Sequence, residues 1–398
     1  MRTLQLLLLV VLAVSTAHAL AEIDLETTTA DLLATPPRSE ADEIATRRWA
    51  VLPEFGYAPD TGVLVGAKFT HRDLAASGTT LDVEALYGTG GDQQLEVTIA
   101  SPHLAGEHVI VLVRAGYVND PERDFFGLGN NDVGSDALST HRYERAQAFV
   151  AAAWRPIPRL ALQLATGVRH LHIGHGDRDG GTPFTVDAFP ALPGVEGGVV
   201  VPLEASVVWN TREGIVRPTR GWRAIAKVSH ANPGILSDFR FTRWVADVGY
   251  LMPFNEGAQV LGIRANAAYD HGNPRGIPFW ELEELGGDDT LEGFFPRRFL
   301  GSARILVNAE LRVRLGGVPF FHLWYLDFDG VLFAGAGRVF IDSDDLGRRY
   351  APGDAHRIRV AGGPGLRIAV SQALVARIDV GFSNEETGIV YLAFGQTF

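Results

Sequence analysis

The sequence predicts an all-β protein, a 16-stranded antiparallel transmembrane β-barrel of the outer membrane. Three observations predict this class: an N-terminal export signal, a series of segments in which apolar and polar residues alternate, and connections that alternate between short and long. The chain has 398 residues, 46% hydrophobic and 21% charged, which excludes a disordered protein. It has no Cys, which excludes disulfides and cysteine-ligated clusters, and its formal charge of −12 argues against a nucleic-acid partner.

The export signal comes first in the chain. An apolar stretch over residues 4–14 follows Arg2 and precedes Ala17-His18-Ala19. A basic start, a short apolar run and an A-x-A site are typical of a secretory signal peptide, predicted here over residues 1–19. Residues 20–48 contain Pro36-Pro37 and many small polar residues, which predicts a flexible periplasmic N-terminal segment without a core of its own. The barrel is predicted over residues 49–398.

Sixteen segments show the period-2 alternation of half-buried strands. In the segment around Leu311 one face is apolar and the other is polar or charged: Val307, Ala309, Leu311 and Val313 against Asn308, Glu310, Arg312 and Arg314. The sixteen segments are centred on these residues: Phe55, Val65, Val83, Val97, Val111, Ala148, Leu164, Val207, Ala226, Val245, Ile263, Leu311, Phe333, Leu366, Ile378 and Leu392.

The connections between these segments sort by length. Long ones follow odd-numbered strands, roughly over residues 119–139, 173–198, 271–301 and 341–355, whereas the connections after several even-numbered strands are short. Short periplasmic turns and long outer loops are typical of a transmembrane barrel. In hydrocarbon a sheet must close on itself to pair its backbone groups, so the apolar face is expected to meet lipid and the charged face the lumen. A secreted β-sandwich or solenoid is the alternative.

The end of the chain fits the same class. Phe394, Gln396 and Phe398 alternate up to an aromatic terminal residue, which looks like the assembly signal of bacterial outer-membrane barrels. Enzyme or metal chemistry is not indicated. His170, His172 and His175 with Asp177 are expected to be rim residues, and Asp342, Asp344 and Asp345 a solvated loop without calcium-loop spacing. The sequence therefore predicts no catalytic residue, no metal site and no cofactor.

Several motifs in order resemble the barrel of the BamA/TamA superfamily, also called bacterial surface antigens. They are listed in chain order: Phe125-Phe126-Gly127-Leu128-Gly129-Asn130-Asn131; Trp209-Asn210-Thr211-Arg212 with Arg217-Pro218-Thr219-Arg220-Gly221-Trp222; Pro278 to Phe294 in the sixth outer loop, ending Leu291-Glu292-Gly293-Phe294; Phe333 to Phe340; and Phe394 to Phe398. Family members usually carry Asp where Asn210 stands. The resemblance covers residues 49–398 and implies a sixth loop folded back into the lumen.

Two positions depart from the family's loop lock, in which a loop Arg meets an Asp of the thirteenth strand. Glu292 stands at the Arg position and Gly335 at the Asp position, so both partners of that lock are missing. By strand parity, Arg312, Arg314, Arg357 and Arg359 are expected to point into the lumen. We therefore expect a reversed lock in which this basic wall holds Glu292, with a solvated Glu292 as the alternative.

The resemblance also implies what such a chain does. Family members that assemble membrane proteins usually carry POTRA domains before the barrel, and the 29 residues between the predicted cleavage site and Trp49 are too few for one. A barrel-only relative is therefore expected. Its role is expected to be insertion or translocation of proteins or lipids through a seam between residues 51–57 and 389–398; the alternative is a passive or loop-gated pore, or a surface antigen. Outer-membrane lipid, lipopolysaccharide, the barrel-assembly machinery and periplasmic chaperones are the expected partners, with the client unknown.

Overall fold

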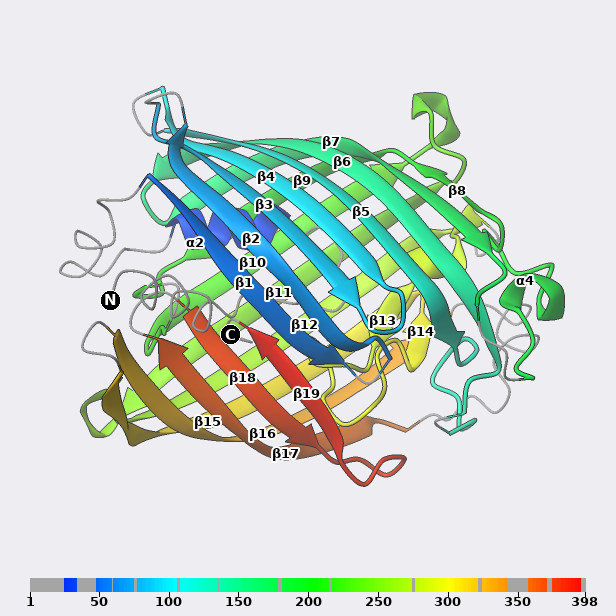
Figure 1. Cartoon of the computed structure of the whole chain (residues 1–398). Helices are drawn as coiled ribbons and strands as arrows, with labels where there is room; N and C mark the ends of the chain where they lie inside the picture. Colours follow the sequence, from blue (N-terminus) through cyan, green and yellow to red (C-terminus); the bar gives the residue numbers. More distant parts are fainter. Residues whose placement is uncertain are drawn as a thin grey trace, which may run out of the picture.

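A closed antiparallel barrel of sixteen strands forms the body of the protein (Figure 1). The computed structural model describes these residues: 25–33, 48–58, 60–74, 77–105, 108–134, 136–177, 181–214, 217–273, 276–320, 324–341, 357–370 and 374–394. The main sheet contains 17 strand segments because a break at Val201 divides one barrel strand into β8 and β9. Each of the sixteen predicted centres lies within a different barrel strand, which confirms the predicted fold class.

The strands have these bounds: β1 Trp49–Ala58, β2 Gly62–Leu74, β3 Thr79–Gly88, β4 Gln93–Leu104, β5 Val109–Phe125, β6 Ser139–Ile157, β7 Leu160–Gly174, β8 Gly197–Val200, β9 Pro202–Asn210, β10 Gly221–Ala231, β11 Phe241–Phe254, β12 Gln259–Gly272, β13 Glu283–Leu285, β14 Phe299–Gly301, β15 Ala303–Phe320, β16 Trp324–Phe340, β17 Arg359–Val370, β18 Leu374–Gly381 and β19 Ile389–Phe394. The helices are α2 Leu25–Leu33, α4 Thr185–Ala188, η1 Pro233–Ile235, η2 Asn255–Gly257 and η4 Phe279–Glu281. In the described residues, no helix is long and apolar enough to cross a bilayer.

The two faces of the strands differ as the alternation predicts. On β7, Leu164 is 68% exposed on the outer face, whereas Gln163 and Arg169 are buried on the inner face. The same division holds along β12, where Ile263 and Tyr269 face outward. The outer face therefore suits hydrocarbon, and the charged side chains lie in the lumen.

Part of the segment predicted to be flexible is ordered. Within residues 20–48, the structure describes residues 25–33 as α2, which lies inside the barrel against β7 and β9 (Figure 1). Leu25, Ala30 and Leu33 are buried there. The helix forms because the inner wall offers an apolar surface to these three residues, a contact that local composition does not reveal.

Other predicted features lie outside the described residues. They are the signal peptide over 1–19, the acidic residues Asp342, Asp344 and Asp345, and the terminal residues Gln396 and Phe398. Phe394 is the last residue of β19.

Candidate functional site

The sixth outer loop, residues 273–302, is called loop 6 below. It contains η4 and the short hairpin β13–β14, and its described residues bring apolar side chains into the barrel. Leu285, Leu291, Phe294 and Phe299 are all fully buried in one cluster. The predicted loop motif, residues 291–294, is thus placed in the interior of the molecule.

A buried ionic cluster surrounds the tip of loop 6 and is called the inner cluster. Arg377 of β18 lies 3.1 Å from Asp288 of the loop, measured from Nη2 to Oδ2. Arg367 of β17 contacts Glu310 of β15 at 2.7 Å and Asp379 of β18 at 2.5 Å. Each of these side chains other than Asp288 is at most 3% exposed. The cluster therefore joins loop 6 to β15, which follows it in the chain, and to β17 and β18, which are distant in sequence.

Glu292 lies at the edge of the inner cluster and is 6% exposed. Burial, and next the carboxylate of Asp379, raises the pKa of Glu292 well above its ordinary value, while Arg377 and Arg367 act in the opposite direction. Within the inner cluster, Asp288 supplies the loop carboxylate that pairs directly with an arginine.

The four arginines of the expected reversed lock have other partners, and this corrects the prediction. Their closest acidic partners are as follows: Arg312 with Glu310 at 2.8 Å, Arg314 with Asp327 at 2.6 Å, Arg357 with Asp132 at 2.5 Å, and Arg359 with Asp132 at 2.7 Å. Parity gives the face on which a side chain lies but not its depth. Asn308 Nδ2 donates to the Thr290 carbonyl of loop 6, and Arg314 lies six residues further along β15, about 20 Å along the strand toward the periplasmic end.

Close backbone packing holds the loop motif against the wall. Gly293 has φ +120°, and a Cβ there would lie 2.8 Å from the carbonyl oxygen of Phe382. A Cβ on Gly335, at the family's Asp position, would lie 2.8 Å from Leu291 Cδ1. The space of the missing Asp is therefore filled by an apolar loop residue, so the wall around residue 335 has an apolar rather than an ionic contact with the loop.

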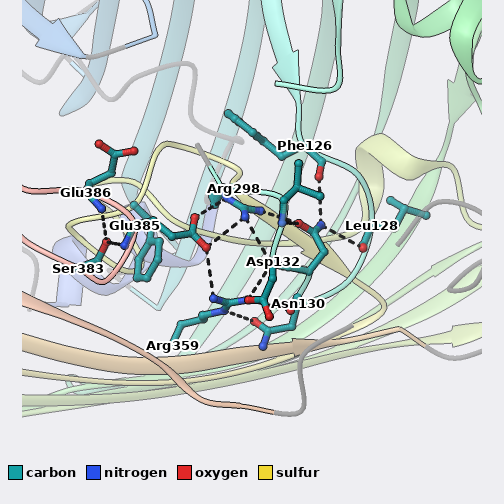
Figure 2. A network of polar contacts seen from close by, with 12 residues as sticks. Phe126, Leu128, Asn130, Asp132, Arg298, Arg359, Ser383, Glu385 and Glu386 are labelled. Carbon is teal, nitrogen blue, oxygen red and sulfur yellow. Dashed lines mark hydrogen bonds and ion pairs between the residues drawn. The ribbon is translucent and has the colours of Figure 1, made fainter. Parts of the chain in front are cut away.

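An outer cluster links loop 6 to the third outer loop, residues 126–138, and to the eighth, residues 382–388. Arg298 of loop 6 is fully buried and contacts Glu385 at 2.7 Å, and it donates to Asn131 Oδ1 at 3.0 Å. Figure 2 shows Arg298 beside Arg359, which contacts Glu385 at 3.2 Å and Asp132. The arrangement ties three loops into one cover over the lumen.

Asn130 and Asn131, at the end of the motif that begins at Phe125, hold the third outer loop in place. Asn131 Nδ2 donates to the carbonyl oxygens of Phe126 and Leu128, which closes the loop on itself. Asn130 accepts from Arg359 Nε at 3.3 Å and donates to the carbonyl of Arg357. The sequence motif does not indicate this contact with Arg357 and Arg359.

A third set of ion pairs anchors the other side of loop 6. Glu281 of η4 is 4% exposed and pairs with Arg169 of β7 and, at 3.2 Å, with Arg243 of β11. Glu283 of β13 pairs with Arg304 of β15 at 3.2 Å. Loop 6 thus contacts opposite parts of the wall, so it crosses the lumen.

The helix α2 occupies the inner wall from the periplasmic side. Lys227 Nζ lies 3.3 Å from Glu26, and Arg212 Nη2 lies 2.9 Å from Asp31. Asn210 Nδ2 donates to the carbonyl oxygen of Ala30 at 2.5 Å, while its Oδ1 accepts from the backbone N–H of Arg212. An Asp at position 210, usual in the family, has no donor for Ala30.

An apolar area of the lumen wall lies under α2. The wall residues of this area are buried, and five of the ten are alanines: Ala100, Ile110, Leu112, Phe149, Ala151, Ala153, Ala161, Ala165, Val208 and Ile225. The alternation of the strands predicts a polar lumen wall, whereas the wall in this area is apolar. Ala151 and Ala153 on β6 and Ala161 and Ala165 on β7 are the sequence signal for this area, because small residues that face inward leave room for a helix.

Exchanging Asn210 for Asp is expected to weaken the docking of α2. The change removes the donor to Ala30 and places a carboxylate against its carbonyl oxygen, at a cost of about 1–3 kcal/mol. Faster hydrogen exchange at residues 25–33 would report it. Asn255→Asp, the same change at an exposed turn, should leave the exchange of α2 unaltered; equal exchange in both variants would contradict the assigned contact.

A second prediction concerns pH. Asp92 lies in the outer turn between β3 and β4, where burial, and next the Asp120 carboxylate, raises the pKa of Asp92 to about 7. A carboxyl with a raised folded-state pKa favours folding when protonated, so this stability is lost as pH rises from about 4 to about 7. Hydrogen exchange of the turn, corrected for intrinsic rates, should therefore be faster at pH 8 than at pH 5.

Asp92→Asn should remove this pH dependence. Asp187→Asn, at an exposed position of the fourth outer loop, should keep it. A turn whose exchange is unaffected by pH in the natural protein would contradict the role of Asp92.

The rim histidines do not form a metal site in the structure. His175 Nε2 contacts Asp187 at 3.0 Å, and His170 and His172 are exposed on the outer face. Among the residues that are described, no group of three or more His, Asp or Glu is placed to hold a metal ion.

The barrel closes at a seam between its first and last strands. Within the described part of the chain, β1 and β19 share one paired position, Tyr57 with Leu392. β19 pairs with β18 at six positions, and β1 pairs with β2 at ten. Tyr391 of β19 also contacts loop 6: its hydroxyl accepts from Gly293 N–H at 3.0 Å and donates to the Phe294 carbonyl at 2.8 Å.

These features define a class of protein: an outer-membrane barrel of sixteen strands with its sixth outer loop folded into the lumen and its first strand meeting its last. The chain belongs to the Omp85 superfamily, because the Omp85 superfamily domain matches residues 75–398. This confirms the resemblance and the outer-membrane location. Among curated proteins, none matches this chain.

Solved structures show the same fold. BamA from Haemophilus ducreyi lacking POTRA domains 1–3 is 16% identical with a TM-score of 0.62, over 87% of this chain and 69% of that one. CdiB from Escherichia coli is 11% identical with a TM-score of 0.62, over 88% of this chain and 63% of that one. CdiB from Acinetobacter baumannii is 10% identical with a TM-score of 0.51, over 87% of this chain and 58% of that one.

Proposed function

We propose that this barrel assists the insertion or translocation of proteins or lipids at the outer membrane by opening the seam between β1 and β19. The observation that carries the proposal is the single paired position, Tyr57 with Leu392, that joins these strands in the described residues. Unpaired strand edges bind other strands, so an opened seam would offer an edge to a client strand.

Outer-membrane lipid, lipopolysaccharide, the barrel-assembly machinery and periplasmic chaperones are the partners we propose for this chain.

A disulfide across the seam tests the proposal, because the natural chain has no Cys. The locked variant carries Tyr57→Cys and Leu392→Cys. Its matched control carries Ala246→Cys and Ala267→Cys, a paired position on the outer faces of β11 and β12. Both are placed in phosphatidylethanolamine/phosphatidylglycerol vesicles, and folding of a urea-unfolded eight-stranded outer-membrane barrel is followed by gel mobility.

The reduced protein and the oxidised control should accelerate folding of the added barrel. The oxidised seam variant should lose the acceleration and regain it on reduction. Acceleration that persists in the oxidised seam variant would overturn the seam mechanism.

A loop-gated pore is the second candidate function. It is favoured by the closure of the lumen from both ends, by loop 6 through Glu281 and Asp288 and by α2 through Glu26 and Asp31. Planar-bilayer conductance separates the candidates. A large conductance after removal of loop 6 or α2, without any acceleration of barrel folding by the intact protein, would favour the pore.

A further inference from the structure

The hairpin of β15 and β16 extends past its neighbour on the periplasmic side. β12 begins at Gln259, which pairs with Val313, and the N–H of Arg314 donates to the carbonyl of Ala258 at 2.8 Å. Among the described residues, residues 316–320 of β15 pair with β16 alone, and Leu315 lies at a break in the register. Six residues of strand extend about 20 Å. The two strands run together at the lower left of the barrel in Figure 1.

We call this extension, residues 315–320 with 324–326, the periplasmic ribbon. It begins at a bulge between Arg314 and Gly316, where Gly316 has φ +129°. Bulges bend a strand and increase its twist. The ribbon can therefore change direction relative to the barrel wall at this point.

The ribbon is apolar where a periplasmic connection is expected to be polar. Its residues carry no charge, whereas the connection between β9 and β10 carries Arg212, Glu213, Arg217 and Arg220. Leu315 is 65% exposed and Val318 is 49% exposed. Exposed apolar strands in water promote aggregation, so a cover for this surface is required.

The apolar side of the ribbon continues the surface of the barrel that faces lipid. Val318 pairs with Leu326, which shares the outer face of β16 with Leu332 through the alternation of the strand. Leu332 is 63% exposed on that face. The ion pair of Arg314 with Asp327 lies on the opposite side, toward the lumen.

Pro319 argues for lipid, and against an added protein strand, as the cover of the ribbon. A partner strand adding to the free edge of β15 needs backbone N–H donors there, and Pro319 has none. Prolines at sheet edges oppose strand addition. Lipid makes no such demand, because acyl chains form no hydrogen bonds with a strand edge.

We propose that the periplasmic ribbon binds the inner, phospholipid leaflet of the outer membrane, with Leu315, Val318 and Leu326 in contact with its acyl chains. The ribbon thereby anchors the β15–β16 side of the barrel to that leaflet. The inference does not depend on whether the seam opens.

Spin labels test the proposal in a chain that has no natural Cys. Val318→Cys is labelled in the full protein, reconstituted in phosphatidylethanolamine/phosphatidylglycerol vesicles, and its accessibility to oxygen and to a water-soluble nickel complex is measured. Leu332→Cys is the control for lipid and Ala258→Cys, in the neighbouring turn, the control for water. Heat-modifiable gel mobility confirms folding, and Leu315→Cys replaces Val318→Cys if the latter does not fold.

The oxygen-to-nickel accessibility ratio at residue 318 should match that at residue 332 and exceed that at residue 258 several-fold. A ratio equal to that at residue 258 would overturn the proposal. Protection from the nickel complex that appears only after addition of a periplasmic protein extract would equally overturn it, and would assign the ribbon to a protein partner.

Discussion

Arg377→Ala is expected to release loop 6 from the barrel wall. Arg377 is 3% exposed and is the direct partner of Asp288. Its loss leaves Asp288, Glu292 and Asp379 with Arg367 as the main remaining cation of the inner cluster. Removing one partner of a buried pair costs about 3–5 kcal/mol, so the urea midpoint of unfolding should fall clearly. Limited trypsin should also cut after Arg297 or Arg298, whose side chains are 10% and 0% exposed in the natural protein.

Arg314→Ala is the matched control. Arg314 is half-exposed in its pair with Asp327, and exposed pairs contribute only about 0–1 kcal/mol. Trypsin should leave loop 6 intact in this variant. If Arg314→Ala exposed the loop and Arg377→Ala did not, the reversed lock first expected from the sequence would be right and the inner cluster would not hold the loop.

Arg298→Ala is expected to separate the three outer loops. The guanidinium is fully buried, makes two contacts with Glu385 and stacks over Phe299 with 4.4 Å between its central carbon and the ring centre. Its removal should cost about 3–5 kcal/mol because Glu385 stays buried with Arg359 as its remaining partner. Hydrogen exchange should become faster over residues 126–134 and 382–388.

Arg298→Lys tests whether geometry or charge matters. Lysine keeps the charge but not the planar fork that reaches Glu385 and Asn131 together, so an intermediate effect is expected. The exchange of α2 at the periplasmic end should stay unchanged in both variants. A uniform increase over the whole barrel would instead indicate global unfolding and would contradict the local role of Arg298.

The strands and their faces could be predicted because both depend on a local period of two residues. Leu164 and Gln163 are neighbours in sequence, and their opposite environments follow from alternation alone. The partner of the loop could not be predicted in the same way. Arg367 and Arg377 have the same inward parity as Arg359, and only the depth reached by loop 6 selects between them.

The helix α2 escaped prediction for a different reason. Nine residues are too few to form a stable helix alone, so α2 depends on the wall it covers. That wall is apolar because of residues such as Ile110 and Phe149, which come from strands far along the chain. The contact that holds the helix, from Asn210 to Ala30, joins residues 180 positions apart.

The inner cluster has a consequence for the order of assembly. Asp288 and Arg377 are 89 residues apart, so this pair cannot form until β18 has been added to the sheet. Before then, burying Asp288 without its cation would cost several kcal/mol, so this carboxylate stays hydrated. Insertion of the tip of loop 6 and completion of the ring are therefore one late cooperative event, and in a chain truncated before β17 this tip should remain in water.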